Sequence, residues 1–257
     1  MKTPNPADKN SGPKPPQRET GQALPAIEST YKQLAAEKAC EYVRSGMVLG
    51  LGGGSTALWV VKQIAHQIKT GALKDIRAVP CSLAVEAEAL RLGIPLAPFT
   101  EATRIELTID GADEVSPSLD LIKGGGGALL REKIVGQVSD KVVIVVDSSK
   151  LSPVLGSKHS VPVEVLTFGW PLQASYLASL GCRVMPRKDV GCSWFQTDQG
   201  NMILDCQFGP IKDPQKLALT LDERSGIIEH GLFLGMAHEV IVSGEKGTRI
   251  LKRLRSN

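Results

Sequence analysis

The chain has 257 residues, of which 42% are hydrophobic and 22% charged, an ordinary make-up for a globular protein of one large domain or two modest ones. Of its formal net charge of +3, residues 1–25 carry +2 and residues 249–257 carry +4, so that residues 26–248 carry −3. A protein that binds nucleic acid keeps its positive charge on the folded body and uses aromatic rings for stacking, and this chain, with 4% aromatic residues, fits neither requirement.

The first 25 residues contain six of the sixteen prolines, set among polar residues. Such a segment buries too little apolar surface to offset the entropy lost on ordering, so we predict a disordered tail over residues 1–25.

From residue 26 to 158, amphipathic segments alternate with short apolar ones. We expect a helix that Ser29 or Thr30 caps and that ends near Gly46, followed by further helices near 58–68, 85–92 and 128–138. The predicted strands are 47–51, 76–80, 105–110 and 141–147. The last strand, KVVIVVD, is apolar throughout, which is typical of a strand buried on both faces. This alternation predicts a parallel sheet in an α/β domain of Rossmann-like type.

Residues 159–230 have a different pattern and are predicted to form a smaller α+β domain of ferredoxin-like type, inserted toward the C-terminus. Its expected strands are 161–166, 182–185 and 202–205, its helices 171–180 and 214–223, with a hairpin-like turn at 197–201. The large domain then comprises 26–158 and 231–257, with strands at 232–234 and 239–242 expected to rejoin its sheet. The basic end, residues 249–255, is interpreted as a solvated helix face or tail.

The first candidate functional cluster is GLGGGSTA, residues 50–57, between a predicted strand and a helix. Glycines let the backbone approach an anion, and a helix N-terminus offers N–H groups and positive potential, so the loop is typical of phosphate binding. It also satisfies a dinucleotide fingerprint, which requires an acid near the end of the next strand. Asp75 precedes that strand instead, which weakens this interpretation; a turn without a ligand is the remaining alternative.

The second cluster is DGADE, residues 110–114, directly after a predicted strand. Ligands of open α/β sheets bind beyond the carboxyl ends of the strands, where this loop falls. Asp110 and Asp113 could serve as metal ligands, as acid and base groups, or as caps of a turn.

The third cluster is KGGGGALLREK, residues 123–133, in which four glycines follow Lys123 and precede a helix. Four consecutive glycines form no stable regular element, so they indicate a close approach of the backbone to another group. Glu132 lies four residues after Ala128, on the same side of the helix, and could face the loop; the alternative is an exposed Glu between Arg131 and Lys133. The four histidines are scattered without metal-ligand spacing.

With these residues in place, the chain resembles the ribose-5-phosphate isomerases of the A type. The resemblance runs from about residue 31 to about 250 and rests on the motifs GLGGGSTA, DGADEV, KGGGGALLREKIV, VVDSSK and VPVEVL. It implies a Rossmann-like domain with a smaller α+β domain, and the interconversion of D-ribose 5-phosphate and D-ribulose 5-phosphate in the non-oxidative branch of the pentose phosphate pathway. It also implies that the reaction needs no metal and no cofactor.

The resemblance further implies a role for particular residues. Glu132 is the base that moves a proton between C1 and C2 of the sugar, and Asp110, Asp113 and Lys123 assist ring opening and stabilise charge on oxygen. The implied substrate contacts, including those to the phosphate, are Gly53, Gly54, Ser55, Thr56, Gly111, Ala112, Gly124, Gly125, Gly126 and Lys150. The chemistry agrees, because an enediolate needs one base that reaches both carbons and a cation where oxygen charge grows.

Members of this family usually carry Thr where this chain has Gly53, so we expect weaker substrate binding with activity retained. Residues 81–85 (CSLAV) also replace a stretch usually richer in Ser and Thr. The alternative function is a non-catalytic protein that binds or senses a sugar phosphate, and a nicotinamide-linked oxidoreductase is the third hypothesis. Cys81 is interpreted as a packing residue, because a thiol nucleophile has no role in this chemistry.

Location and assembly follow from weaker signals. Five cysteines without a C-x-x-C pair indicate reduced thiols, the start of the chain has no apolar leader, and no apolar run approaches the ~18 residues of a membrane span. We therefore expect a cytoplasmic protein without a membrane partner, and the resemblance implies a homodimer or homotetramer.

Overall fold

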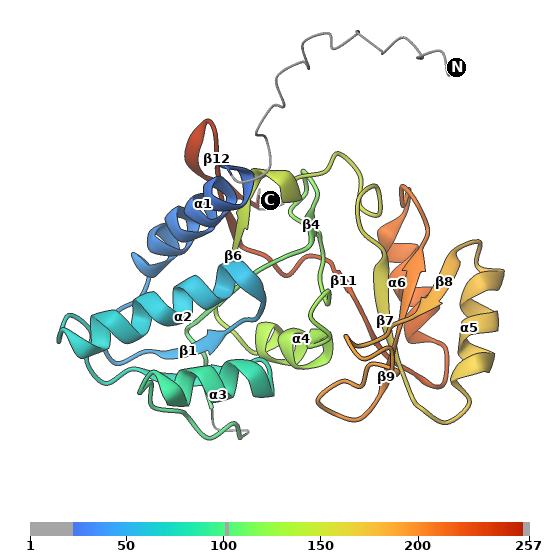
Figure 1. Cartoon of the computed structure of the whole chain (residues 1–257), viewed down its shortest axis with the longest axis horizontal. Coiled ribbons are helices and arrows are strands. Elements are labelled where there is room, and N and C mark those ends of the chain that lie inside the picture. Colours follow the sequence, from blue (N-terminus) through green and yellow to red (C-terminus); the bar gives the residue numbers. More distant parts are fainter. Residues whose placement is uncertain (1–22, 101–102, 254–257) are drawn as a thin grey trace, which may run out of the picture.

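The computed structural model describes residues 23–100 and 103–253, with side chains described from residue 28 onward. Most of the predicted tail, residues 1–22, and residues 254–257 lie outside this part. Within it, no helix combines the length and the apolar character needed to cross a membrane. The chain forms two bodies side by side, a large domain built around one sheet and a small domain with a sheet of its own (Figure 1).

The large domain is built on a six-stranded sheet in the order β13-β12-β6-β3-β1-β2. All neighbours are parallel except β12 and β13, which form an antiparallel hairpin. The strands are β1 (Val48–Leu51), β2 (Arg77–Pro80), β3 (Leu107–Asp110), β6 (Val142–Asp147), β12 (Glu239–Gly244) and β13 (Gly247–Lys252). All six residues of β6 are buried, which confirms the prediction for KVVIVVD.

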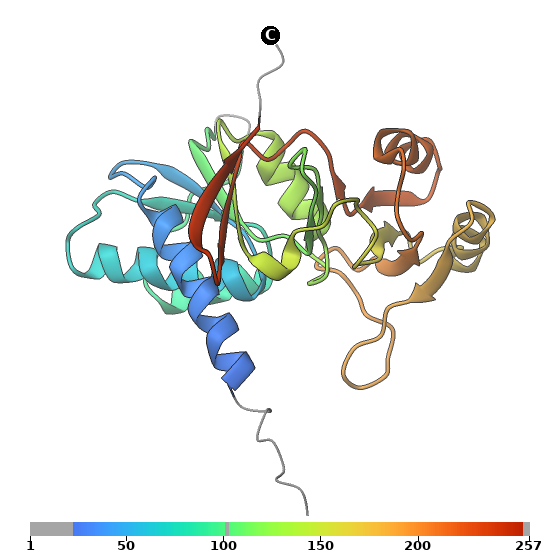
Figure 2. The ribbon, with the colours of Figure 1, turned by 90° about the horizontal axis from the view of Figure 1, so that it is seen from above.

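Helices cover both faces of this sheet. On one face lie α1 (Ala23–Cys40), α2 (Gly54–Lys69) and α3 (Leu83–Arg91), which share one buried hydrophobic cluster with Val143 and Val145 of β6. The alternate residues Ile144 and Val146 point to the other face, which packs against α4 (Leu129–Gln137) and a three-stranded sheet. Figure 2 shows the sheet between these two layers. The predicted Rossmann-like α/β class is confirmed.

The small domain has a four-stranded antiparallel sheet in the order β10-β7-β9-β8. Its elements follow one another as β7 (Val161–Val165), α5 (Trp170–Ser179), β8 (Arg183–Pro186), β9 (Met202–Gln207), α6 (Pro214–Asp222) and β10 (Ile227–His230). This βαββαβ succession is the ferredoxin-like arrangement that the sequence predicted. The strand β10 was not predicted. The domain boundaries at 159 and 230 stay a prediction.

The third sheet corrects one expectation about residues 232–234. The strand β11 (Leu232–Phe233) does not rejoin the six-stranded sheet; it pairs with β5 (Leu121–Ile122), which pairs with β4 (Glu114–Val115). Two-residue strands are too short to carry a periodic pattern, so their partners are set by tertiary contacts. The expectation for 239–242 is confirmed, because β12 pairs with β6.

Both ends of the folded chain also differ from expectation. Helix α1 begins at Ala23, so Ser29 and Thr30 lie inside it and are not its N-cap, and it ends at Cys40 rather than near Gly46. The basic residues Arg249 and Lys252 belong to the edge strand β13, not to a helix or tail. A two-residue turn joins β12 to β13, and charged side chains on an edge strand discourage pairing with other chains.

Candidate active site

Parallel pairing brings the first two sequence clusters together. The strands β1 and β3 are neighbours, so the loop after Leu51 and the loop after Asp110 leave the sheet at the same edge. Beside them lies a cavity of about 590 Å³ whose wall contains residues from all three clusters and from the small domain. The lining residues predicted from the sequence are Gly53, Gly54, Ser55, Thr56, Gly111, Ala112, Asp113, Lys123, Gly124, Gly125, Gly126, Glu132 and Lys150.

One end of the cavity is the N-terminus of α2, a helix of sixteen residues. Gly53 is the N-cap residue, and Gly54 has a φ of +81°, which glycine adopts without strain. The first N–H groups of a helix have no partner within it, so together with the hydroxyls of Ser55 and Thr56 they form an anion-binding end.

Asp110 is a buried residue that binds both the backbone of two loops and the side chain of Lys123. Its Oδ1 accepts hydrogen bonds from the backbone N–H groups of Gly53 (3.0 Å) and Gly111 (2.7 Å), and its Oδ2 lies 2.9 Å from Nζ of Lys123. A Cβ on Gly52 would lie 1.9 Å from Oδ1, so this position requires glycine. Unlike Asp113, Asp110 is absent from the cavity wall among the described residues.

Glu132 and Lys123 form the ionised centre of the site. Oε2 of Glu132 lies 3.2 Å from Nζ of Lys123, and both side chains are buried. Burial first, and then the charge of Asp110, raise the pKa of the Glu132 carboxyl to about 7 against the opposing charge of Lys123. Burial acts to lower the pKa of Lys123, but the carboxylates of Asp110 and Glu132 outweigh it and raise that pKa above its usual value. The result is a carboxylate that titrates near neutrality beside a permanent cation.

Two side chains, those of Asp113 and Phe195, lie close to the backbone of the glycine run after Lys123. Oδ2 of Asp113 accepts a hydrogen bond from the N–H of Gly125 at 2.7 Å, and a Cβ at that position would lie 2.8 Å from the carboxylate. The ring of Phe195 would lie 2.4 Å from a Cβ on Gly127, whose φ is +80°. The close backbone approach that the sequence predicted is confirmed.

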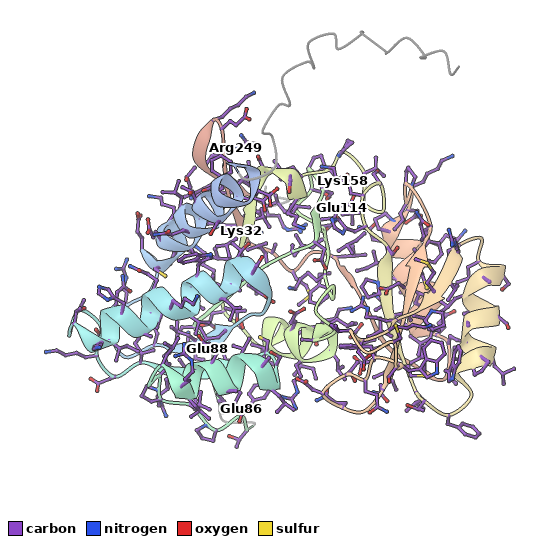
Figure 3. All side chains as sticks on the ribbon, in the orientation of Figure 1. Lys32, Glu86, Glu88, Glu114, Lys158 and Arg249 are labelled. Atoms are coloured by element: carbon purple, nitrogen blue, oxygen red, sulfur yellow. The ribbon has the colours of Figure 1, made fainter. Side chains whose placement is uncertain are left out.

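Several residues of the wall were not among the predicted site residues, although three of them lie in the stretch 81–85 that departs from the family pattern. Ser82, Ala84, Val85 and Glu88 come from α3 and its N-cap; Figure 3 labels Glu88 on that helix. The others are Leu58, Lys62, Gly127, Ala128, Phe195 and Asp198. The last two belong to the small domain, where the polar stretch 197–201 indicated only a turn. Cys81, next to Ser82, is fully buried, and burial raises the pKa of its thiol, in keeping with a packing residue.

The last acid of DGADE acts outside the cavity. The buried carboxylate of Glu114, labelled in Figure 3, accepts hydrogen bonds from the N–H groups of Gly156, Ser157 and His159, each at 3.1 Å. It therefore fixes the segment that follows Lys150.

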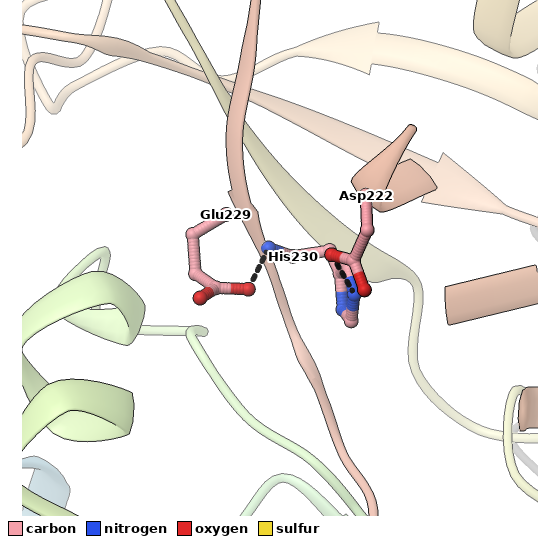
Figure 4. Close-up of side chains that lie close together, drawn as sticks. All are labelled: Asp222, Glu229 and His230. Carbon is pink, nitrogen blue, oxygen red and sulfur yellow. Dashed lines mark hydrogen bonds and ion pairs between the residues drawn. The ribbon is translucent and has the colours of Figure 1, made fainter. Parts of the chain in front are cut away.

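A separate cluster lies in the small domain. Among the described residues, Asp222, Glu229 and His230 place ligand atoms within 4.8 Å of one another, close enough to share a metal ion (Figure 4). The ammonium of Lys133 already lies 2.5 Å from Oε1 of Glu229, and Nε2 of His230 lies 3.2 Å from Asp222. Glu229 of this cluster is thus paired with a cation of α4, and burial lowers the pKa of His230, which favours its neutral form.

The nucleotide alternative finds no support in this geometry. A ribose-binding acid has to lie at the carboxyl end of the second strand, whereas Asp75 precedes β2 and so lies at its amino end. Beyond the carboxyl end of β2 lie Cys81 and the N-cap Ser82.

Comparisons with known proteins give the relationship. A family model of ribose 5-phosphate isomerase A (phosphoriboisomerase A) matches residues 77–247. The ribose-5-phosphate isomerase A of Desulfatibacillum aliphaticivorans is 50% identical over 225 residues, which cover 88% of this chain and 98% of the relative. That of Chloroflexus aurantiacus is 50% identical over 220 residues, which cover 86% and 92%.

Solved structures agree. The ribose 5-phosphate isomerase of Plasmodium falciparum has a TM-score of 0.86 and 38% identity, covering 88% of this chain and 100% of that one. A D-ribose-5-phosphate isomerase in complex with phospho-erythronic acid has a TM-score of 0.85 and 36% identity, covering 87% and 98%. As the motifs DGADE, KGGGG and REK predicted, the chain belongs to the ribose-5-phosphate isomerase A family.

Proposed function

We propose that this protein interconverts D-ribose 5-phosphate and D-ribulose 5-phosphate, with Glu132 as the base. The observation that carries the proposal is the buried Glu132 carboxyl, with a pKa raised to about 7, 3.2 Å from the Lys123 ammonium in a cavity that ends at the α2 N-terminus. Family membership and the phosphorylated sugar acid bound in one solved relative support the same substrate class.

In the direction from aldose to ketose, the substrate phosphate lies at Gly53–Thr56 and the open-chain sugar extends toward Lys123. Glu132 takes the proton from C2, and negative charge grows on the oxygen of C1. Lys123 and the N–H groups of the glycine loop stabilise that charge. Glu132 then returns the proton to C1 while the hydroxyl proton moves from the oxygen of C2 to the oxygen of C1, which gives the ketose.

The other site residues support this step without transferring the proton. Asp110 holds Lys123 and the Gly53 loop, and Asp113 and Lys150 line the sugar side of the cavity.

The alternative, a protein that only binds the sugar phosphate, gives Glu132 no role, because a buried carboxylate is costly and an anionic ligand binds better without it.

The proposal places the enzyme in the cytoplasm as a homodimer or homotetramer. Its five free thiols support a reducing compartment.

The decisive test compares the wild-type protein with Glu132→Gln in the isomerisation of ribose 5-phosphate, measured in excess chelator. The expected result is turnover that resists the chelator and falls by about 10²-fold or more in the variant. Glu223→Gln, an exposed change at the C-cap of α6, is the matched control and keeps full activity. Turnover unaffected by Glu132→Gln would assign the base elsewhere, and a folded wild-type protein that binds the sugar phosphate without turnover would favour the binding protein.

A further inference from the structure

The two neighbours of Glu132 on α4 both bind the small domain. Nη1 of Arg131 lies 3.8 Å from Oδ2 of Asp198, in the connection between β8 and β9 (residues 187–201). The amide of Gln199 is oriented by its hydrogen bonds to Arg131. In the orientation that satisfies them, its side-chain oxygen accepts from Nε and Nη2 of Arg131 at 2.6 and 3.0 Å. In Figure 1 this connection reaches toward α4 from the small domain.

Lys133 makes the second attachment, on β10. Its buried Nζ lies 2.5 Å from Oε1 of Glu229 and donates to the carbonyl oxygen of His230 at 2.8 Å. The same ammonium lies 4.9 Å from the centre of the Phe233 ring, and Nζ of Lys123 lies 5.4 Å from that ring. The Phe233 ring therefore contacts both the ammonium of Lys133 and that of Lys123, the cation that pairs with Glu132.

The β8–β9 connection is itself held firmly. The buried Glu164 of β7 accepts hydrogen bonds from Oγ1 of Thr197 (2.8 Å) and Nδ2 of Asn201 (3.0 Å). Asp198 also accepts from the N–H of Leu83, the first residue of α3, at 2.8 Å. The β8–β9 connection, which Glu164 holds in place, thus contacts both α3 and α4.

Helix α4 lacks the local features that would fix its first turn. It has nine residues, its N-cap is Ala128, whose methyl group accepts no hydrogen bond, and glycines precede it. Glu132 lies in that first turn. The direction of the base therefore depends on tertiary contacts, namely the packing of the buried Leu129 and the partners of the residues beside Glu132.

We propose that Arg131 and Lys133 are positioning residues, through which the small domain fixes the rotation of α4 and directs the Glu132 carboxylate toward Lys123. The inference rests on the proposed function of Glu132. Neither side chain belongs to the cavity wall among the described residues, so replacing either one removes no residue of that wall. A misplacement of the base by about 1 Å is enough to cost up to about 10²-fold in rate.

The experiment measures kcat and KM for Arg131→Met and Lys133→Met. Positioning predicts a kcat lower by about tenfold to a hundredfold with KM changed less than about threefold. The matched control is Arg224→Met, because Arg224 binds Gln173 and Tyr176 inside the small domain and leaves α4 untouched. Arg131→Met and Gln199→Ala, alone and combined, form a double-mutant cycle; a shared contact makes their effects on kcat non-additive.

Because Lys133→Met leaves the Glu229 carboxylate without its cation, Lys133→Met with Glu229→Gln is measured beside it. Folded variants with unchanged kcat, or with the whole loss in KM, would overturn the inference even where Glu132→Gln lowers turnover as expected. If the wild-type protein itself is inactive on ribose 5-phosphate, the proposed function fails instead.

Discussion

Lys123 holds two buried carboxylates at once, with Nζ 2.9 Å from Oδ2 of Asp110 and 3.2 Å from Oε2 of Glu132. Asp110 also accepts hydrogen bonds from two backbone N–H groups, whereas Glu132 lies in the cavity wall. The same cation therefore serves as a structural partner to one acid and as an electrostatic partner to the other. Of the two acids, this division favours Glu132 as the proposed base.

The pH dependence of turnover follows from the pKa of Glu132, which burial raises to about 7. The base has to be ionised, so kcat/KM is expected to fall as the pH decreases through about 7 and to level off above it. A profile of kcat/KM between pH 5 and 9 measures this. A base with the ordinary pKa of 4.5 would instead leave kcat/KM flat over that range.

The same pKa predicts the stability of Glu132→Gln. Because the folded-state pKa is higher than the ordinary 4.5, the native protein holds more protons than the unfolded chain between these values. The contribution of Glu132 to the stability of the wild-type protein is therefore expected to decrease as the pH rises from about 4.5 to 7. Replacing the carboxyl with an amide removes this effect, so the variant should have the higher Tm at pH 8, and the difference should shrink toward pH 5. Thermal unfolding at both pH values checks the sign; equal Tm values at pH 8 would contradict it.

Gly53→Thr is expected to strengthen substrate binding. The backbone at Gly53 has a φ of −104°, which any residue adopts, and a Cβ there would lie 3.4 Å from Oε1 of Glu132, an ordinary contact. The hydroxyl adds one hydrogen bond at the phosphate end, so KM should fall by about two- to tenfold with kcat nearly unchanged. Gly52→Ala is the contrasting variant, since its Cβ would collide with Asp110. A raised KM in Gly53→Thr would mean that the side chain displaces Glu132.

Glu114→Gln is expected to lower the free energy of unfolding by about 1–3 kcal/mol. The amide replaces a charged acceptor by one neutral oxygen and an NH₂ group that faces the N–H donors of Gly156, Ser157 and His159. Urea unfolding of the variant beside the exposed control Glu223→Gln measures the difference. The segment after Lys150 should also become more accessible to protease, and unchanged cleavage there would argue against this anchoring role.

Much of the fold was predictable because local patterns carried it. The apolar segment 141–147 indicated a strand buried on both faces, and the glycines of 52–54 and the acids of 110–114 indicated loops that follow the strands before them. The spacing of Glu132 from Ala128 allowed two positions, facing the loop or exposed, and in the structure its side chain is buried in the cavity wall. Helix ends were less certain: α1 continues to Ala23 through Ser29 and Thr30, residues that resemble caps but lie within a longer helix.

The sequence by itself determined the α/β class, the ferredoxin-like small domain, the family and the main groups of the site, because periodicity, glycine runs and acids act over a few neighbouring residues. Only the tertiary structure decided which distant groups meet. It paired Leu232–Phe233 with β5, made a strand of residues 247–252, and brought Phe195 and Asp198 to the cavity. It also decided the pKa of Glu132, because burial and the distances to Lys123 and Asp110 depend on contacts between separate parts of the chain.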